Sequence, residues 1–212
     1  MNKKIAIIDY QLGNLFSVQQ ACIYLGYNAK ITSNPLDIVS ADYVILPGVG
    51  AFEDAMSNMN KLDLIVPTLD YIASGKPFMG VCLGLQLLFT ESEEFGISKG
   101  LNIVEGTVKR FKSKDSTGNL LKIPQIAWNE IHEPALNTWE NTPLQMCSQG
   151  DYMYFVHSYY VKPELKSVIL STTNYGGYDY CSSIIKNNVF ACQFHPEKSS
   201  KQGLIIYEKF FK

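Results

Sequence analysis

The feature of this sequence that most constrains its fold is a regular alternation of short apolar runs with amphipathic stretches in its first half. Buried strands are predicted by the apolar runs at 4–9, 28–32, 42–47 and 76–81. Helices are predicted by apolar spacing of three and four residues at 14–26, at 51–75 as one or two helices, and at 83–94. Such alternation favours parallel strands that are joined by right-handed crossovers.

The second half of the chain has a different pattern, in which extended segments are separated by turn signals such as "STGN" and "NYGGYDY". The extended segments are 101–111, 123–131, 152–161, 167–175 and 189–197, and a final helix is predicted at 199–211. No internal repeat, low-complexity tract or linker divides the sequence. We therefore predict a single α/β domain over residues 1–212, with a mostly parallel sheet flanked by helices and an antiparallel extension.

Charge and composition argue against several classes of function. The formal net charge is −2, and no run of Lys or Arg suggests a nucleic-acid partner. No apolar stretch is long enough for a membrane span, and the N-terminus lacks the apolar region of a signal peptide, so a cytoplasmic protein is expected. The five cysteines lack C-x-x-C spacing, which fits neither a disulfide framework nor a zinc site, and no metal is expected.

One cysteine stands in an unusual local context, the segment "PFMGVCLGLQLLF" at 77–89. Cys82 lies at the predicted junction of a strand and a helix, two residues after Gly80 and two before Gly84. Nucleophile elbows occur at such junctions, and glycines relieve the crowding of the tight turn because they lack Cβ. The helix N-terminus would also favour the thiolate. The alternative is a buried cysteine at the end of an apolar strand, the commonest fate of a free thiol.

A thiolate nucleophile needs a base, and the chain contains three histidines. His132 lies among polar residues and is expected at the surface, while His157 lies in an aromatic strand and fits a hydrogen-bonded core histidine. Glu197 follows His195 by two residues, and Pro196 favours an extended conformation that places both side chains on one face. A carboxylate there would fix the imidazole tautomer, so His195 is the candidate base. The alternative is a chance H-P-E at a strand terminus.

A third requirement of acyl transfer is a set of hydrogen-bond donors for the oxyanion. The segment "LPGVGAF" at 46–52 follows the third predicted strand, and its glycines allow the amides of Val49 and Gly50 to turn toward a neighbouring site. In a parallel sheet such loops gather at the carboxyl ends of the strands, the same edge as Cys82. The amide of Leu83 would be the second donor. The rival interpretation is a phosphate-binding loop, but the segment lacks the G-K-[ST] of a P-loop.

Together, G-x-C-x-G, P-G-x-G and H-P-E resemble the class I, or triad, glutamine amidotransferases. The resemblance covers nearly the whole chain and is strongest to the family of glutaminase subunits of imidazole glycerol phosphate synthase. It is carried by "IAIIDYQLGNLFSVQQAC", "VILPGVGAFEDAM", "GVCLGLQLLFTESEE", "PQIAWN", "YFVHSYY" and "CQFHPEKS". It implies a class I glutamine amidotransferase-like fold.

The resemblance also implies a reaction. Cys82 would attack the side-chain amide of L-glutamine, His195 would carry the proton to the leaving ammonia, and Glu197 would orient His195. The ammonia would pass into a (βα)8-barrel cyclase that makes imidazole glycerol phosphate and an aminoimidazole carboxamide ribonucleotide in histidine biosynthesis. No metal or organic cofactor is implied.

Further residues are implied to bind the substrate. Gln86 and Glu94 would hold the amino-acid end of glutamine. Ser158 and Tyr159 would contact its carboxylate, and Gly50 would lie against it.

A partner interface is predicted around "PQIAWNEI". Trp128 stands beside Asn129, and a tryptophan with a hydrogen-bonding neighbour is a common interface anchor. The alternative is a core tryptophan, since this side chain is buried on average. The resemblance implies that this segment and "DYQLGN", with Asn14, face the synthase in a heterodimer whose interface covers the glutaminase site.

Two positions depart from the family pattern. Gln125 stands where the family usually has His, and Gln11 stands where it usually has Gly. Both lie in segments that the family uses near its synthase. A paralogous glutaminase that supplies ammonia to a different synthase, such as one that amidates a surface sugar, is therefore an alternative. A degenerate binding scaffold is disfavoured by the intact triad, and a peptidase or deglycase relative by the H-P-E pair.

Overall fold

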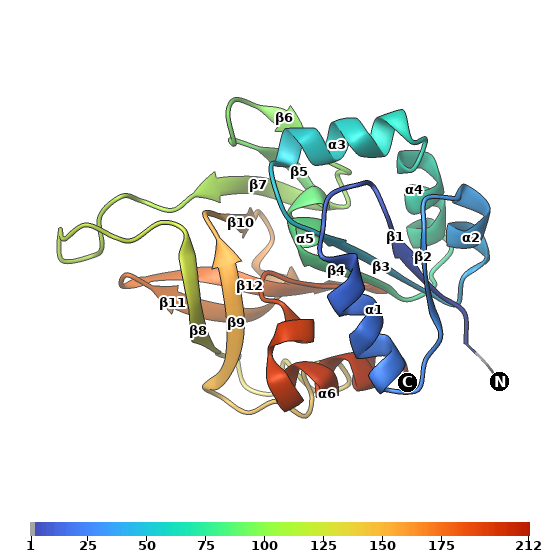
Figure 1. Cartoon of the computed structure of the whole chain (residues 1–212). Helices are drawn as coiled ribbons and strands as arrows, with labels where there is room; N and C mark the ends of the chain where they lie inside the picture. The colour runs from blue at the N-terminus through green and yellow to red at the C-terminus, as the bar shows by residue number, and fades with distance from the viewer. Residues whose placement is uncertain (1–2) are drawn as a thin grey trace.

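A long sheet runs through the molecule, whose computed structural model describes residues 3–212 (Figure 1). Its parallel half comprises, in spatial order, β2 (Ala29–Thr32), β1 (Ile5–Ile8), β3 (Tyr43–Gly48), β4 (Phe78–Cys82) and β13 (Val189–Cys192). The sheet continues through β12 (Tyr178–Lys186), β10 (Tyr159–Pro163), β7 (Val104–Arg110), β5 (Phe89–Ser92) and β6 (Ser98–Lys99). This second half is antiparallel except for the β5–β7 pair, and β11 (Ile169–Tyr175) pairs with β12. A separate antiparallel hairpin is formed by β8 (Gln125–Ile131) and β9 (Asp151–His157).

Helices cover both faces of the parallel half. On one face lie α1 (Leu15–Tyr24) and α6 (Ser200–Phe210), and on the other lie α2 (Pro35–Ser40), α3 (Phe52–Lys61) and α4 (Ile65–Ala73), while α5 (Leu83–Leu87) follows β4. In β1, Ile5 and Ile7 pack in the core beneath α1 and α6, whereas Ala6 and Ile8 pack in the core on the opposite face. Because both faces are buried, the central strands are apolar throughout rather than alternating.

Two helices, α1 and α2, begin at an asparagine whose side chain caps them. Asn14 Oδ1 accepts a hydrogen bond from the Ser17 amide at 3.3 Å, and Asn34 Oδ1 accepts one from the Leu36 amide at 2.9 Å. Pro35 follows Asn34 at the first position of α2, where its missing N–H costs nothing. Within residues 3–212, no helix is long and apolar enough to cross a membrane.

The predicted α/β architecture with a parallel sheet and an antiparallel extension is confirmed, and 51–75 forms two helices. The helix predicted at 83–94 is confirmed over Leu83–Leu87 and is wrong beyond it, since Phe89–Ser92 form β5. That segment pairs with β7 and β6, and sheet pairing with distant strands overrides local helical spacing. The sequence patterns also missed α2 and β12, and the predicted strand 152–161 is two strands that are separated at Ser158.

The turn between β4 and α5 is packed so closely that only glycine fits on either side of Cys82. A Cβ atom on Gly84 would lie 1.7 Å from the carbonyl oxygen of Leu46 in β3. One on Gly80 would lie 2.9 Å from the carbonyl oxygen of Gly84 and 3.0 Å from Cβ of Ala191 in β13. The two glycines therefore allow the turn to sit against the strands on both sides of β4.

Gly84→Ala should destabilise the protein, because its methyl group must push α5 away from the β3 backbone. We expect the free energy of unfolding to fall by about 1–3 kcal/mol or more, measured by urea denaturation. Gly118→Ala is the control, since nothing lies within 4 Å of the added Cβ and only its positive φ is unfavourable. Equal losses in the two variants would contradict the close approach of α5 to β3.

Candidate active site

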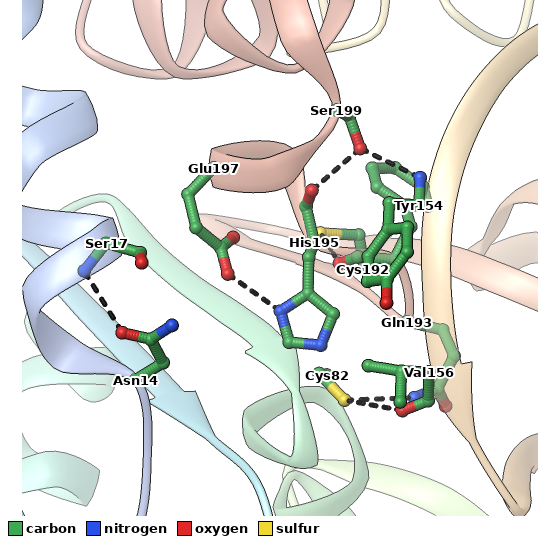
Figure 2. Close-up of polar contacts among 11 residues, drawn as sticks. Asn14, Ser17, Cys82, Tyr154, Val156, Cys192, Gln193, His195, Glu197 and Ser199 are labelled. Atoms are coloured by element: carbon green, nitrogen blue, oxygen red, sulfur yellow. Dashed lines mark hydrogen bonds and ion pairs between the residues drawn. The ribbon is translucent and has the colours of Figure 1, made fainter. Parts of the chain in front are cut away.

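Cys82 occupies a strained turn between β4 and α5, at the strand–helix junction that its sequence context predicts. Its backbone has φ 55° and ψ −107°, and such a conformation in a residue other than glycine costs on the order of 1–3 kcal/mol. The residue is 5% exposed. Its sulfur lies 3.9 Å from the carbonyl oxygen of Val156 and 3.7 Å from Nε2 of Gln193 (Figure 2).

His195 and Glu197 are joined by a hydrogen bond of 2.7 Å between Nδ1 and Oε1, and both side chains are buried. A carboxylate only accepts hydrogen bonds, so Nδ1 carries the proton and Nε2 is left free. The opposite edge of the ring, which carries Nε2, faces Cys82 (Figure 2). His195 is extended as predicted, but Glu197 lies in a 3₁₀ turn, Pro196–Lys198, because proline favours the first position of such a turn.

The surroundings of His195 favour its charged form. Burial lowers the pKa of the imidazole, but the negative charge of a Cys82 thiolate and the bonded Glu197 carboxylate outweigh burial and raise it to about 10. The ordinary value is about 6.5. At neutral pH the His195 ring is therefore positively charged, and its Nε2 edge faces the sulfur of Cys82 (Figure 2).

The other two histidines have structural surroundings, as expected. His157 is 6% exposed, its Nδ1–H donates to the Tyr159 carbonyl oxygen at 2.7 Å, and its Nε2 lies 3.3 Å from the hydroxyl oxygen of Tyr180. Burial lowers the pKa of His157 to about 4, although the bond to Tyr159 opposes this and a charge on His195 adds to it. His132 is partly exposed and lies 3.2 Å from a carboxylate oxygen of Glu130.

A cavity of about 260 Å³ opens beside Cys82. All the residues predicted to form the oxyanion and substrate sites line it, namely Val49, Gly50, Leu83, Gln86, Glu94, Ser158 and Tyr159. His157 and Pro124 complete the wall with Cys82 and Val156, whereas His195 and Glu197 lie beside Cys82 outside the lining (Figure 2). The volume suits a ligand of amino-acid size rather than a nucleotide.

Two residues of this wall offer only hydrogen-bond acceptors to a ligand. Gln86 Nε2 donates to the Tyr159 carbonyl oxygen at 3.0 Å and to Gln193 Oε1 at 3.1 Å, so both of its N–H groups are used. Its Oε1 is the atom left for a substrate. Glu94 accepts from the Phe52 amide at 2.8 Å, and burial raises its pKa. Such acceptors suit an ammonium group.

The loops at the carboxyl ends of β1 and β3 are in contact, as the parallel topology predicts. A Cβ atom on Gly13 would lie 3.4 Å from Cα of Gly48, and one on Gly50 would lie 3.9 Å from the Leu12 side chain. The 9–14 loop therefore lies directly against the loop that carries Val49.

The predicted interface residues lie at or near the surface. Asn14 is exposed at the start of α1. Trp128 is 48% exposed on β8, so it is not a core tryptophan, and its ring stands 6.1 Å from that of Tyr154. Asn129 Nδ2 donates to the carbonyl oxygen of Asn174 at 2.8 Å, which fixes its side chain beside β11.

Gln193 is the residue at this site that sequence reasoning missed. It is fully buried, and its side-chain amide lies between Gln86 and Cys82. A signal was present in the sequence, because Gln193 precedes His195 by two residues and alternate residues of extended chain share a face.

The remaining cysteines are poor nucleophile candidates. Burial raises the pKa of Cys22 and of Cys147 to about 12, and it raises the pKa of Cys181 and of Cys192 further. Within residues 3–212, no group of three or more His, Cys, Asp or Glu side chains is arranged to hold a metal ion.

Residues 6–212 match the family described as glutamine amidotransferase class-I. The chain is 47% identical over 210 residues to the imidazole glycerol phosphate synthase subunit HisH of Syntrophotalea carbinolica, in an alignment that covers 97% of this chain and 98% of that protein. The chain belongs to the HisH family of class I glutamine amidotransferases. It is therefore assigned to an enzyme family. The HisH subunit of Aquifex aeolicus is 45% identical, with 98% of this chain and 95% of that protein covered.

Solved structures share the fold at low sequence identity. PurLQS from Thermotoga maritima has a TM-score of 0.72 and 15% identity, with 100% of this chain and 98% of that chain covered. A structure described as glutamine amidotransferase has a TM-score of 0.71 and 16% identity, with 98% and 96% covered. The class I glutamine amidotransferase-like fold is thereby confirmed.

The buried, neutral His157 should make stability depend on pH. Above about pH 6.5 the imidazole is neutral in both the folded and the unfolded chain. As the pH falls from there to about 4, the unfolded chain binds a proton that folded His157 refuses, so the free energy of unfolding decreases. In urea titrations across this window, the free energy of unfolding of His157→Gln should decrease less steeply with falling pH than that of the unmodified chain. The two slopes should differ by up to about 1.4 kcal/mol per pH unit.

His132→Gln is the matched control. Its free energy of unfolding should change with pH as that of the unmodified chain does. His195 does not obscure the comparison, because its raised pKa gives stability that is complete below pH 6.5 and is lost only as the pH rises. Equal slopes in His157→Gln and the unmodified chain would show that His157 is not held neutral.

Proposed function

We propose that this chain, as one domain over residues 1–212, hydrolyses L-glutamine through a thioester on Cys82 and supplies the ammonia to a (βα)8-barrel cyclase. The observation that carries the hydrolysis is the buried Cys82 elbow, which faces the His195–Glu197 pair and opens on a cavity with acceptors for an amino acid. The partner is inferred from the HisH relatives, which are named as subunits of imidazole glycerol phosphate synthase. The pathway would be histidine biosynthesis.

In the first half-reaction, the Cys82 thiolate attacks the side-chain amide carbon of glutamine. The amides of Leu83 and of the Val49–Gly50 loop stabilise the resulting oxyanion. The His195 imidazolium gives its Nε2 proton to the nitrogen as the C–N bond breaks, so ammonia leaves and a γ-glutamyl thioester remains on the sulfur.

In the second half-reaction, water attacks the thioester. Neutral His195 takes a proton from the water at Nε2, and the C–S bond breaks as the Cys82 thiolate leaves. Glutamate is released, and the thiolate–imidazolium pair is restored. Glu197 keeps the proton on Nδ1 throughout, so Nε2 is always the atom that exchanges protons.

Substrate recognition follows from the acceptors and donors of the cavity wall. The α-ammonium group of glutamine would bind Oε1 of Gln86 and the Glu94 carboxylate, since both are acceptors that lack a second protein donor. The α-carboxylate would lie against the Ser158–Tyr159 segment and Gly50. This arrangement places the side-chain amide of the substrate beside Cys82.

The partner surface is proposed from large apolar side chains that are exposed near this edge of the sheet. Phe16 is 66%, Trp128 48% and Val49 40% exposed. The ring of Trp128 contacts Tyr154, whose own ring lies 6.4 Å from His195, so a partner on Trp128 would be close to the active site. Burial of these apolar groups against a partner would stabilise the complex. A heterodimer over Asn14, Trp128 and Asn129 would cover the glutaminase site.

The test is to titrate a purified (βα)8-barrel cyclase subunit of imidazole glycerol phosphate synthase, with its nucleotide substrate, into this chain while glutamate release is followed. Glutamate release should be slow alone and rise by about 5- to 150-fold with the partner, the range of a typical coupling free energy. Trp128→Ala should weaken the partner's apparent affinity by about 30-fold. Leu165 is 59% exposed beyond the far end of β10, and Leu165→Ala should leave the partner's apparent affinity unchanged.

Variants of the histidines separate the chemistry from the partner. With saturating cyclase, His195→Ala should lose about 100-fold or more of the rate, and His132→Ala should retain it. Full activity of the isolated chain, unchanged by the cyclase, would contradict the partner proposal. Equal losses in His132→Ala and His195→Ala would contradict the assignment of the base.

A further inference from the structure

Gln193 joins the substrate wall to the nucleophile through a short line of side-chain amides. The line begins at the main-chain carbonyl of Tyr159, which accepts Nε2–H of Gln86 at 3.0 Å. The same Nε2 donates to Oε1 of Gln193 at 3.1 Å, and Nε2 of Gln193 points at Sγ of Cys82 at 3.7 Å. Gln86 and Cys82 are each 5% exposed and Gln193 is fully buried, so solvent competes little with these bonds.

The orientation of each amide in this line is determined by its neighbours. A main-chain carbonyl can only accept, so the atom of Gln86 that faces Tyr159 must be the nitrogen. That nitrogen also faces Gln193, so the atom of Gln193 nearest to it must be the oxygen. The nitrogen of Gln193 is then the atom that faces the sulfur, and a flipped amide would break the bond to Gln86.

The sulfur of Cys82 therefore lies between two groups that prefer different protonation states. The carbonyl oxygen of Val156, at 3.9 Å, can only accept and favours the neutral thiol. Nε2–H of Gln193 can only donate and favours the thiolate. The Gln193 contact is the shorter of the two, and Figure 2 shows both reaching the sulfur from the side away from Glu197.

From this geometry we infer that Gln193 is a positioning residue for the nucleophile, whose amide donates a hydrogen bond to the Cys82 thiolate and holds it charged beside His195. The inference rests on the proposed function, and it adds a fourth side chain to the three of the triad. No proton or bond is transferred at Gln193.

The bond is strongest in the states in which the sulfur is an anion. These are the resting thiolate and the thiolate that leaves when water resolves the thioester. In the thioester itself the sulfur is neutral and a weak acceptor. Gln193 therefore stabilises the sulfur before attack and again as it leaves, while the Gln86 bond keeps its amide in place in between.

The test is the pH dependence of alkylation of Cys82 by iodoacetamide in the full chain, with the labelled peptide located by mass spectrometry. Gln193→Met keeps the size of the side chain but removes the donor. The pH of half-maximal alkylation rate should rise by about one pH unit, since a hydrogen bond to a charged group is lost. Gln193→Glu keeps the bond from Gln86 but turns an acceptor toward the sulfur, so its midpoint should rise further.

Gln125→Met is the matched control. Gln125 is also a fully buried glutamine, but its amide contacts the Tyr180 hydroxyl at 3.1 Å. Its midpoint should equal that of the unmodified chain, as should the midpoint of any variant that is only less stable. Urea denaturation checks that each variant folds. If Gln193→Met does not fold, the midpoint of Gln193→Glu decides the test.

Midpoints that stay unmoved in the folded Gln193 variants would overturn the inference, and so would an equal rise in Gln125→Met. The proposed function fails in a different way, namely if the unmodified chain with its cyclase releases no glutamate. The alkylation midpoint requires neither glutamine nor partner, so the two failures are distinguishable.

Discussion

The site depends on the close approach of the β4–α5 turn to the backbone of β3. Gly84 brings α5 so near to Leu46 that no side chain fits between them, and this packing holds Cys82 at a positive φ that the residue alone would avoid. This turn places the sulfur beside the imidazole of His195 (Figure 2). The strained backbone of Cys82 is therefore held by sheet packing on both sides of β4, through Gly84 toward β3 and Gly80 toward β13.

Around this turn, charge is controlled by a few buried hydrogen bonds. The Tyr159 carbonyl accepts from both His157 and Gln86, so one main-chain oxygen fixes the tautomer of His157 and orients the amides that lead to Cys82. Burial keeps the ring of His157 neutral, whereas Glu197 favours the charged ring of His195. The two buried histidines therefore titrate on opposite sides of neutral pH, and at neutral pH the charged one lies beside the thiol while the neutral one lines the cavity.

Local sequence signals were enough for the elbow, for the His195–Glu197 pair and for the edge of the sheet at which the loops meet. Each of these depends on residues close in sequence or on the parallel topology. The sequence could not show that Phe89–Ser92 leaves the helical pattern, because its partners in β7 lie about 15 residues further along the chain. The sequence also could not show how exposed the Trp128 side chain is, because burial depends on which strands pair. Gln193 was missed although its spacing matched, because its importance depends on contacts with Gln86 and Cys82 that only the fold creates.

The central claim is that glutamine is hydrolysed through a covalent intermediate on Cys82, and trapping that intermediate tests it most directly. The chain is mixed with its cyclase, the nucleotide and glutamine, quenched in acid during turnover, and digested for mass spectrometry. The account predicts that one glutamyl group is found on the peptide that contains Cys82 and on no other cysteine. A glutamyl group on the peptide of Cys22, Cys147, Cys181 or Cys192, or rapid glutamate release by Cys82→Ala, would contradict it.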